Sequence, residues 1–179
     1  PFGADRTGIV VGEGAAMLMI EDRDHAIARG ARIYAEVTGY ALTSDAHHRT
    51  APHPEGRGAV QAMMQALSNA GLEPENIDFV SAHGTGTQAN DSCEAIAMSE
   101  VFGERLSEVP VNSIKSMLGH CMGAASAIEN VACVLSIHSG WIPPTISTTE
   151  QDPAFPRPVD LVLDKPREAR VNHIMNNAF

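Results

Sequence analysis

Two short segments of the chain place a histidine beside a glycine at the end of an apolar run. The first, residues 81–87, reads Ser-Ala-His-Gly-Thr-Gly-Thr and follows the apolar residues 77–80. The second ends in Gly119-His120 and lies just after the apolar segment 109–114. Runs of this length predict buried strands, and α/β proteins bind ligands at the carboxyl ends of strands. If the two strands are neighbours, His83 and His120 share one pocket.

Two neutral imidazoles suit the binding of an oxygen atom. Each can donate one N–H to a carbonyl or carboxylate oxygen. The glycines at 84 and 86 let the backbone approach a ligand closely. A single histidine is usually structural, but two histidines in the same strand-end setting favour a catalytic pair.

The elements expected around the two histidines form an α/β unit. Strands are predicted at 77–80 and 109–114, and helices at 90–102, ended by Gly103, and at 121–139, which is apolar or small almost all round. An apolar stripe over 60–67 predicts another helix, closed by Gly71. Strand, helix, strand and helix in this order predict a parallel core with helices on both faces of a mixed sheet.

The segments outside this unit are expected to add short elements. Residues 9–11 and 15–20 are apolar on both sides and predict buried strands around a hairpin-like turn. Residues 33–38 alternate in polarity and predict a strand, whereas 24–29 predict a short helix. Two further short strands are expected at 161–163 and 173–175.

Four charged residues are expected to support the site. Asp91 is predicted to be the N-cap of its helix, with Glu94 at the capping-box position. Glu129 is the lone acid of an apolar helix and needs a partner, for which Lys115 is the obvious candidate. We favour Lys115 as a group that pairs with Glu129 and fixes the loop bearing His120, over a direct catalyst with a depressed pKa.

The cysteines offer an alternative nucleophile. Cys121 follows His120 at a predicted helix start, where a thiolate would be stabilised. Cys93 and Cys133 lie on predicted helices and are interpreted as small buried residues. We favour none of the three as the nucleophile.

A histidine-rich loop offers a candidate metal site. His47, His48 and His53 lie within residues 45–55. Without a regular scaffold or a paired carboxylate, a solvated loop beside the substrate entrance is the favoured interpretation, and no metal is expected.

Composition limits the classes of partner. The chain has 179 residues, 44% hydrophobic and 19% charged, which is typical of one globular domain with a real core. A net charge of −10 argues against nucleic acid and anionic membranes, and no apolar run is long enough to span a bilayer. An acidic carrier protein would need a local basic patch, which the sequence does not clearly show. The three cysteines have neither disulfide-framework nor zinc spacing, so a reducing, cytoplasmic setting is expected.

Five motifs in order resemble the β-ketoacyl synthase family of the thiolase superfamily. His-Gly-Thr-Gly-Thr at 83–87 and Lys-Ser-Met-Leu-Gly-His at 115–120 carry most of the resemblance. Residues 1–14 resemble the pattern P-F-D-x-x-R-D-G-F-V-x-G-E-G, and Pro-Pro-Thr-Ile at 143–146 and Asn-Asn-Ala-Phe at 176–179 also match. Gly3, Thr7 and Ile9 depart from the pattern, which affects local turn contacts more than chemistry.

The resemblance implies a thiolase-like α/β fold, layered α/β/α/β/α with a mixed five-stranded sheet in each half. Both termini are expected to be cut. Residues 1–30 would be a remnant of the amino-terminal half, and 31–179 a carboxyl-terminal half truncated at its end. The nucleophilic cysteine of the family belongs to the upstream half, so this piece alone is expected to be inactive.

The implied activity is an acyl transfer. A synthase of this family joins an acyl chain to malonyl-acyl-carrier protein by decarboxylative Claisen condensation, in fatty-acid, type II polyketide or polyene biosynthesis. By resemblance, His83 and His120 hold the thioester enolate that forms as CO₂ leaves, and Lys115 completes the catalytic set. Removal of one such preorganised donor typically costs about 3–4 kcal/mol.

The resemblance also implies where the substrate binds. Thr85 and Thr87 would hold the amides of a phosphopantetheine arm, although hydroxyls of a turn equally often bond their own backbone. Phe179 is a further expected substrate contact. The protein itself would bind no cofactor, because its substrates are carried on the phosphopantetheine of the carrier.

The expected partners are an acyl carrier protein and a second synthase subunit, in a homodimer or a heterodimer. An alternative function is that of a non-catalytic chain-length-factor subunit. Such subunits often lose the two histidines, and both are kept here, which favours the enzyme. A third possibility is a fragment that only binds or assembles.

Overall fold

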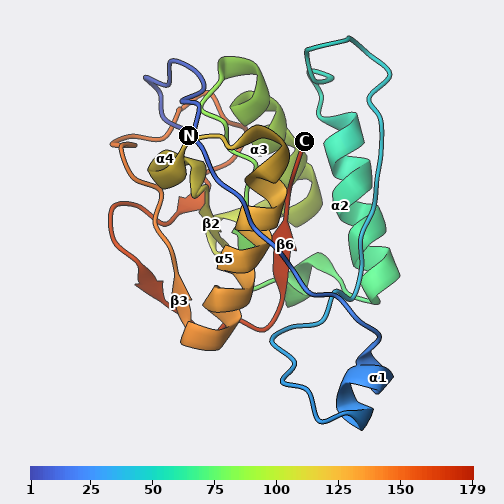
Figure 1. The fold of residues 1–179 in the computed structure, drawn as a ribbon. Helices are drawn as coiled ribbons and strands as arrows, with labels where there is room; N and C mark the ends of the chain where they lie inside the picture. Colours follow the sequence, from blue (N-terminus) through green and yellow to red (C-terminus); the bar gives the residue numbers. More distant parts are fainter.

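A four-stranded parallel β-sheet holds the molecule together (Figure 1). The structure, a computed structural model, describes all residues from 1 to 179. The strand order is β4-β2-β1-β6, and all three neighbouring pairs are parallel. The strands are short: β1 (Phe79–Ser81), β2 (Pro110–Asn112), β4 (Asp160–Leu161) and β6 (Ile174–Asn176).

Helices pack against both faces of this sheet. Successive side chains of a strand point to opposite faces, and β1 shows this directly. Val80 belongs to the large core cluster formed with α2 and α3, whereas Phe79 belongs to a small cluster with Ile142 and Val162, against which Ile137 of α5 packs. The helices are α1 (Arg23–Ala28), α2 (Arg57–Ala70), α3 (Gln88–Phe102), α4 (Lys115–Leu118) and α5 (Ala125–Ser139).

Several expected elements are confirmed. The central strands and the helix order agree with the predicted βαβα unit. Helix α2 buries Met63 and Leu67 and ends at Gly71, whose left-handed backbone lets its N–H bond the carbonyls of the last turn. Gly103 likewise ends α3. An antiparallel pair that was not expected, β3 (Trp141–Ile142) with β5 (Arg167–Glu168), lies beside the main sheet.

The strands predicted in the amino-terminal third were wrong. Residues 9–20 and 33–38 form neither strands nor a hairpin, and the main sheet gains no fifth strand from them. Val11 alone pairs, through an isolated parallel bridge to His120. An apolar run becomes a strand only where a neighbouring chain offers hydrogen-bonding partners, and this segment finds only that one.

The helix predicted at 121–139 is shorter and less buried than expected. A 3₁₀ turn over Met122–Ala124 precedes α5. Only one stripe of α5 is buried, namely Ala125, Glu129, Cys133 and Ser136.

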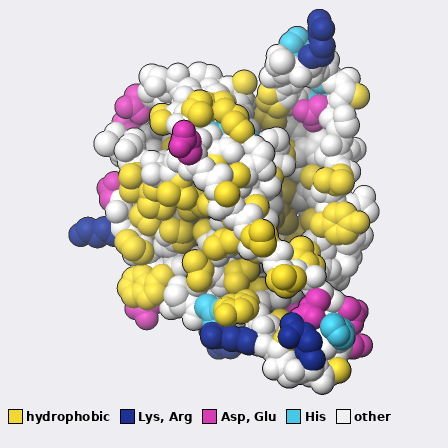
Figure 2. Space-filling model, viewed as in Figure 1, with side chains coloured by type: hydrophobic (Ala, Val, Ile, Leu, Met, Phe, Trp, Pro, Cys, Tyr) yellow, Lys and Arg dark blue, Asp and Glu magenta, His cyan; other side chains and the backbone are white.

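Apolar side chains gather on the face formed by α5 and the extended amino-terminal segment (Figure 2). Met17 is 91% exposed and Leu42 is 90% exposed. Crossing a bilayer would require a long apolar helix, and the chain contains none.

Candidate active site

His83 lies at the carboxyl end of β1, where the backbone is held by a buried carboxylate. Its own N–H donates to Oε1 of Glu94 at 2.8 Å, and the N–H of Gly84 donates to Oε2 at 2.8 Å. Gly84 has φ +41, and a Cβ there would lie 2.6 Å from Ser113. The chain can therefore turn sharply after His83 only with glycine at this position.

His120 is fixed by the extended segment that crosses it. Its N–H donates to the carbonyl of Val10 at 2.7 Å, and the N–H of Gly12 donates to the carbonyl of His120 at 3.1 Å. A Cβ on Gly12 would lie 2.1 Å from the carbonyl oxygen of Leu118. Glycine at 12 thus permits the close approach that holds His120.

The two imidazole rings lie together, as predicted. Their centroids are 5.5 Å apart and the ring planes cross at 86°. Nδ1 of His83 accepts the N–H of Phe179 at 3.4 Å, and Nδ1 of His120 accepts the N–H of Met122 at 3.0 Å. A neutral imidazole whose Nδ1 accepts must carry its proton on Nε2. Each ring therefore has an Nε2–H group as its donor.

The surroundings keep both rings neutral. Burial lowers the pKa of His83 to about 3, and the positive charge of Lys115 and the neighbouring His120 act in the same direction. Burial and Lys115 also lower the pKa of His120. At neutral pH both histidines are uncharged donors.

The predicted pairing of Lys115 with Glu129 is confirmed. The ammonium donates to Oε1 of Glu129, and both side chains are almost fully buried. The same ammonium donates to the carbonyl of His83 at 2.6 Å and lies 3.4 Å from Nδ1 of that ring. Lys115 thus supports His83 directly, as well as beginning α4, the short helix that leads to His120.

Asp91 and Glu94 do not cap α3, contrary to the prediction. Thr87 is the N-cap, and its hydroxyl accepts the N–H of Asn90 at 3.2 Å. The helix therefore starts four residues earlier than a cap at Asp91 would allow. The carboxylate of Asp91 instead accepts the N–H of Gly86 at 3.1 Å and that of Phe2 at 2.7 Å.

Both acids face inward, and both are fully buried. Burial raises the pKa of Glu94 to about 7, opposed by hydrogen bonds from Gly84, His83 and Asn177. Their role is to hold the loop 83–87, so they do support the site, although by a route other than helix capping.

A cavity of about 640 Å³ opens beside the histidines. It is lined by Thr85, Gly86 and residues 115–120, together with residues 146–148 and eight of the first eleven residues. His83 is buried and does not line this cavity, contrary to the expectation that both histidines share one pocket, although its ring lies against that of His120.

Thr87 and Phe179 do not line the cavity. The hydroxyl of Thr87 caps α3 and lies 2.9 Å from that of Thr85. The ring of Phe179 packs against His83, with centroids 5.7 Å apart, and half of the residue is exposed.

Burial disfavours a thiolate at two of the three cysteines. Burial raises the pKa of Cys93 to about 11 and that of Cys133 to about 12. Cys121 precedes a three-residue 3₁₀ turn that leads directly into α5.

The histidine-rich loop has no metal-binding arrangement. Within residues 1–179 no three His, Cys, Asp or Glu side chains come together as metal ligands. The rings of His47 and His53 lie 4.9 Å apart, and the nearby carboxylate of Asp45 already accepts the N–H groups of His53 and Gly58.

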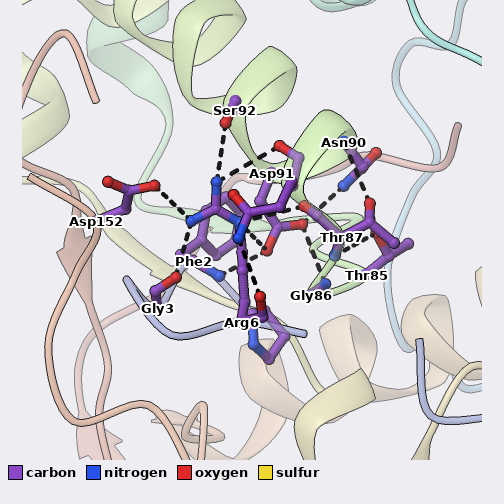
Figure 3. A network of polar contacts seen from close by, with 12 residues as sticks. Phe2, Gly3, Arg6, Thr85, Gly86, Thr87, Asn90, Asp91, Ser92 and Asp152 are labelled. Carbon is purple, nitrogen blue, oxygen red and sulfur yellow. Dashed lines mark hydrogen bonds and ion pairs between the residues drawn. The ribbon is translucent and has the colours of Figure 1, made fainter. Parts of the chain in front are cut away.

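One residue beside the site was missed by the sequence reasoning. The guanidinium of Arg6 lies at the centre of a polar network that joins residues 1–6 to the start of α3 (Figure 3). Residue type alone does not indicate that an arginine in an amino-terminal segment is buried. The resemblance of residues 1–14 to a family motif could have pointed to it.

Comparison with known proteins places the chain in a family. Residues 34–149 match the family described as Beta-ketoacyl synthase, C-terminal domain. All 179 residues align with Nodulation protein E of Rhizobium meliloti at 47% identity, covering 44% of that protein. They also align with 3-oxoacyl-[acyl-carrier-protein] synthase 2 of a Synechocystis species at 44% identity, covering 42%.

Solved structures agree. The ishigamide ketosynthase/chain length factor matches with a TM-score of 0.92 and 50% identity, over 99% of this chain and 42% of that one. A type II PKS ketosynthase in complex with its acyl-carrier protein matches with a TM-score of 0.93 and 36% identity, over 98% and 43%. The chain thus spans less than half the length of these relatives. It has the thiolase-like fold expected from its sequence, and it belongs to the β-ketoacyl synthase family, as the carboxyl-terminal domain.

Proposed function

We propose that the protein containing this chain is a β-ketoacyl-acyl-carrier-protein synthase, an acyltransferase that condenses an acyl chain with a malonyl thioester. The observation that carries the proposal is the pair of neutral imidazoles, His83 and His120, with ring centroids 5.5 Å apart and Nε2 as the donor in each. Two such donors suit one oxygen that gains negative charge during a reaction.

In this mechanism the malonyl carboxylate leaves as CO₂. The electron pair of the broken C–C bond moves into the thioester, whose oxygen becomes an enolate oxygen. The Nε2–H groups of His83 and His120 donate to that oxygen. The enolate carbon then attacks the carbonyl of the acyl thioester, and the sulfur that carried the acyl group leaves as a thiolate.

We propose that the acyl-carrying cysteine lies outside these 179 residues. Two of the three cysteines have raised pKa values, and the third lies beside a single 3₁₀ turn. The division of the chain at residue 30, with the two catalytic histidines in the second part, remains part of this proposal. The 179 residues alone would then not condense acyl groups.

The proposed substrates are carried on an acyl carrier protein. The arm would reach the histidines through the cavity of about 640 Å³, past Thr85. One solved relative is a ketosynthase in complex with its acyl-carrier protein, which supports the same partner here. We also propose that the protein forms a homodimer, or a heterodimer with a related subunit. The proposed location is the cytoplasm, where the three cysteines would remain free thiols. No cofactor held by the protein is required.

The test uses the full-length protein that contains this chain, an acyl-carrier-bound acyl group and malonyl-carrier protein. Mass spectrometry should detect a β-ketoacyl product longer by two carbons, with one CO₂ released per product. The 179 residues assayed alone should give none. A full-length protein that forms no product by itself but permits formation by a partner subunit would instead be a chain-length factor.

A further inference from the structure

The guanidinium of Arg6 is buried and almost fully engaged (Figure 3). Nη1 donates to the carboxylate of Asp152 at 2.6 Å and to the carbonyl of Gly3 at 2.8 Å. Nη2 donates to the hydroxyl of Ser92 at 2.9 Å, and Nε to the carbonyl of Thr87 at 3.2 Å. One side chain thus joins the amino-terminal segment, the start of α3 and the segment around residue 152.

The charge of Arg6 is already compensated within this network. Asp152 forms an ion pair with it, and the carboxylate of Asp91 lies 3.9 Å from Nε. The ring of Phe155 covers the guanidinium, 5.2 Å from centroid to Cζ. Although Arg6 belongs to the cavity wall, it has little free charge to offer an anionic ligand.

The hydrogen bonds of Arg6 reach the point where the loop 83–87 leads into α3. It donates to the carbonyl of Thr87, the N-cap of α3, and accepts the side-chain amide of Gln88 on its own carbonyl at 3.0 Å. The hydroxyls of Thr85 and Thr87 lie 2.9 Å apart, and only Thr85 reaches the cavity. Movement of residue 87 would therefore change the direction in which the Thr85 hydroxyl points.

We propose that Arg6 is a positioning residue for the uncharged, amide-bearing arm of the substrate. It clamps residues 1–6 onto the start of α3 and so holds the Thr85 hydroxyl at the cavity wall. This inference rests on the proposed function for the identity of the arm. The chemistry of the site agrees, because a hydroxyl beside a neutralised guanidinium suits an amide better than a phosphate.

The test compares Arg6→Met and Arg6→Lys in the full-length protein. Two substrates are used: malonyl-pantetheine, which has the amides, and the malonyl thioester of ethanethiol, which has none. For Arg6→Met, KM for malonyl-pantetheine should rise about tenfold, which corresponds to the loss of one hydrogen bond from the Thr85 hydroxyl to the arm. Its kcat, and KM for the amide-free thioester, should stay within about twofold. Arg6→Lys, which keeps a donor, should restore part of the loss.

Arg105→Met is the matched control. Arg105 also donates to backbone carbonyls, those of Pro74 and Ile77, but away from the cavity. It should leave both KM values unchanged. An equal loss of kcat on both substrates in Arg6→Met, or an unchanged KM for malonyl-pantetheine, would overturn the proposal.

Hydrogen exchange gives a readout that needs no activity. Arg6→Met should speed amide exchange in residues 84–90 and leave 125–139 unchanged. Unchanged exchange in 84–90, or uniform acceleration along the chain, would reject the clamp. If the wild-type protein released no CO₂ from either thioester, the proposed function would fail, and the exchange result would still decide whether Arg6 holds the loop.

Discussion

At the scale of single residues, the two imidazoles owe their donor character to backbone groups behind them. The N–H groups of Phe179 and Met122 face Nδ1 of His83 and His120, respectively. These contacts place the remaining proton on Nε2 in both rings. Burial beside the cation of Lys115 then keeps the rings from taking up a second proton.

The neutral state of His83 predicts how stability depends on pH. The pKa is about 3 in the folded chain against an ordinary value of 6.5. Between those values the unfolded chain binds a proton that the folded chain does not. The contribution of His83 is therefore complete above pH 6.5 and is lost as the pH falls toward 3. Urea unfolding from pH 4 to 7 should show a weaker pH dependence in His83→Gln than in wild type, and equal slopes would contradict a neutral His83.

A second prediction concerns the buried ion pair. Lys115→Met should lower the free energy of unfolding by about 3–5 kcal/mol, because Glu129 would remain as an unpaired buried charge. Denaturant titration measures this. The double variant Lys115→Met/Glu129→Leu should recover most of the stability. If Lys115→Met kept full stability and lost only decarboxylation, Lys115 would be a direct catalyst rather than a support.

At the scale of elements, α3 is the part that organises the site. Asp91 and Glu94 lie on its inner side and accept N–H groups from the loop 83–87. The sequence predicted this helix and its end at Gly103, but placed the N-cap at Asp91. Local patterns could not fully explain the position of Asp91, because one of the two N–H groups that its carboxylate accepts belongs to Phe2, 89 residues away in sequence.

The prediction of strands in the amino-terminal third was wrong for a related reason. An apolar run indicates that a segment tends to be buried, but it does not indicate which neighbouring strand would pair with that segment in a sheet. The central strands were predicted correctly because flanking helices and glycines marked them as well. The cavity wall, including Arg6, depends on contacts between residues 1–11 and segments more than 70 positions away, which no local pattern encodes.

The role of α3 gives a prediction at Glu94. Glu94→Gln would turn an NH₂ group toward a backbone N–H that now donates to a carboxylate oxygen. Stability should fall by about 1–3 kcal/mol for the unsatisfied donors, and decarboxylation should fall with it because His83 is displaced. Thermal unfolding and CO₂ release measure both. Glu100→Gln, an exposed change on the same helix, is the control and should alter neither.

At the scale of the whole molecule, family membership was accessible from the sequence because five motifs recur in order. The comparisons confirm it. The character of the surface was harder to predict from the sequence. Residues expected to be buried in strands are instead exposed, and with the outer face of α5 they form a broad apolar surface (Figure 2).

A surface of this kind predicts association. Large exposed apolar patches drive proteins together in water, so the 179-residue chain should sediment as a species heavier than 19.0 kDa. Met17→Glu combined with Leu42→Glu should shift it toward the monomer. Gln65→Glu adds a charge at an exposed polar position of α2 and should not. A wild-type chain that stays monomeric at high concentration would refute this prediction.

The most direct test of the account is CO₂ release from malonyl-carrier protein by the full-length protein and its His83→Ala and His120→Ala variants. If both imidazoles hold the enolate oxygen, each variant should lose about 100-fold or more in rate, as for removal of an oxyanion donor. Circular dichroism should show both variants folded. Folded His83→Ala protein that releases CO₂ at the wild-type rate would contradict the central claim.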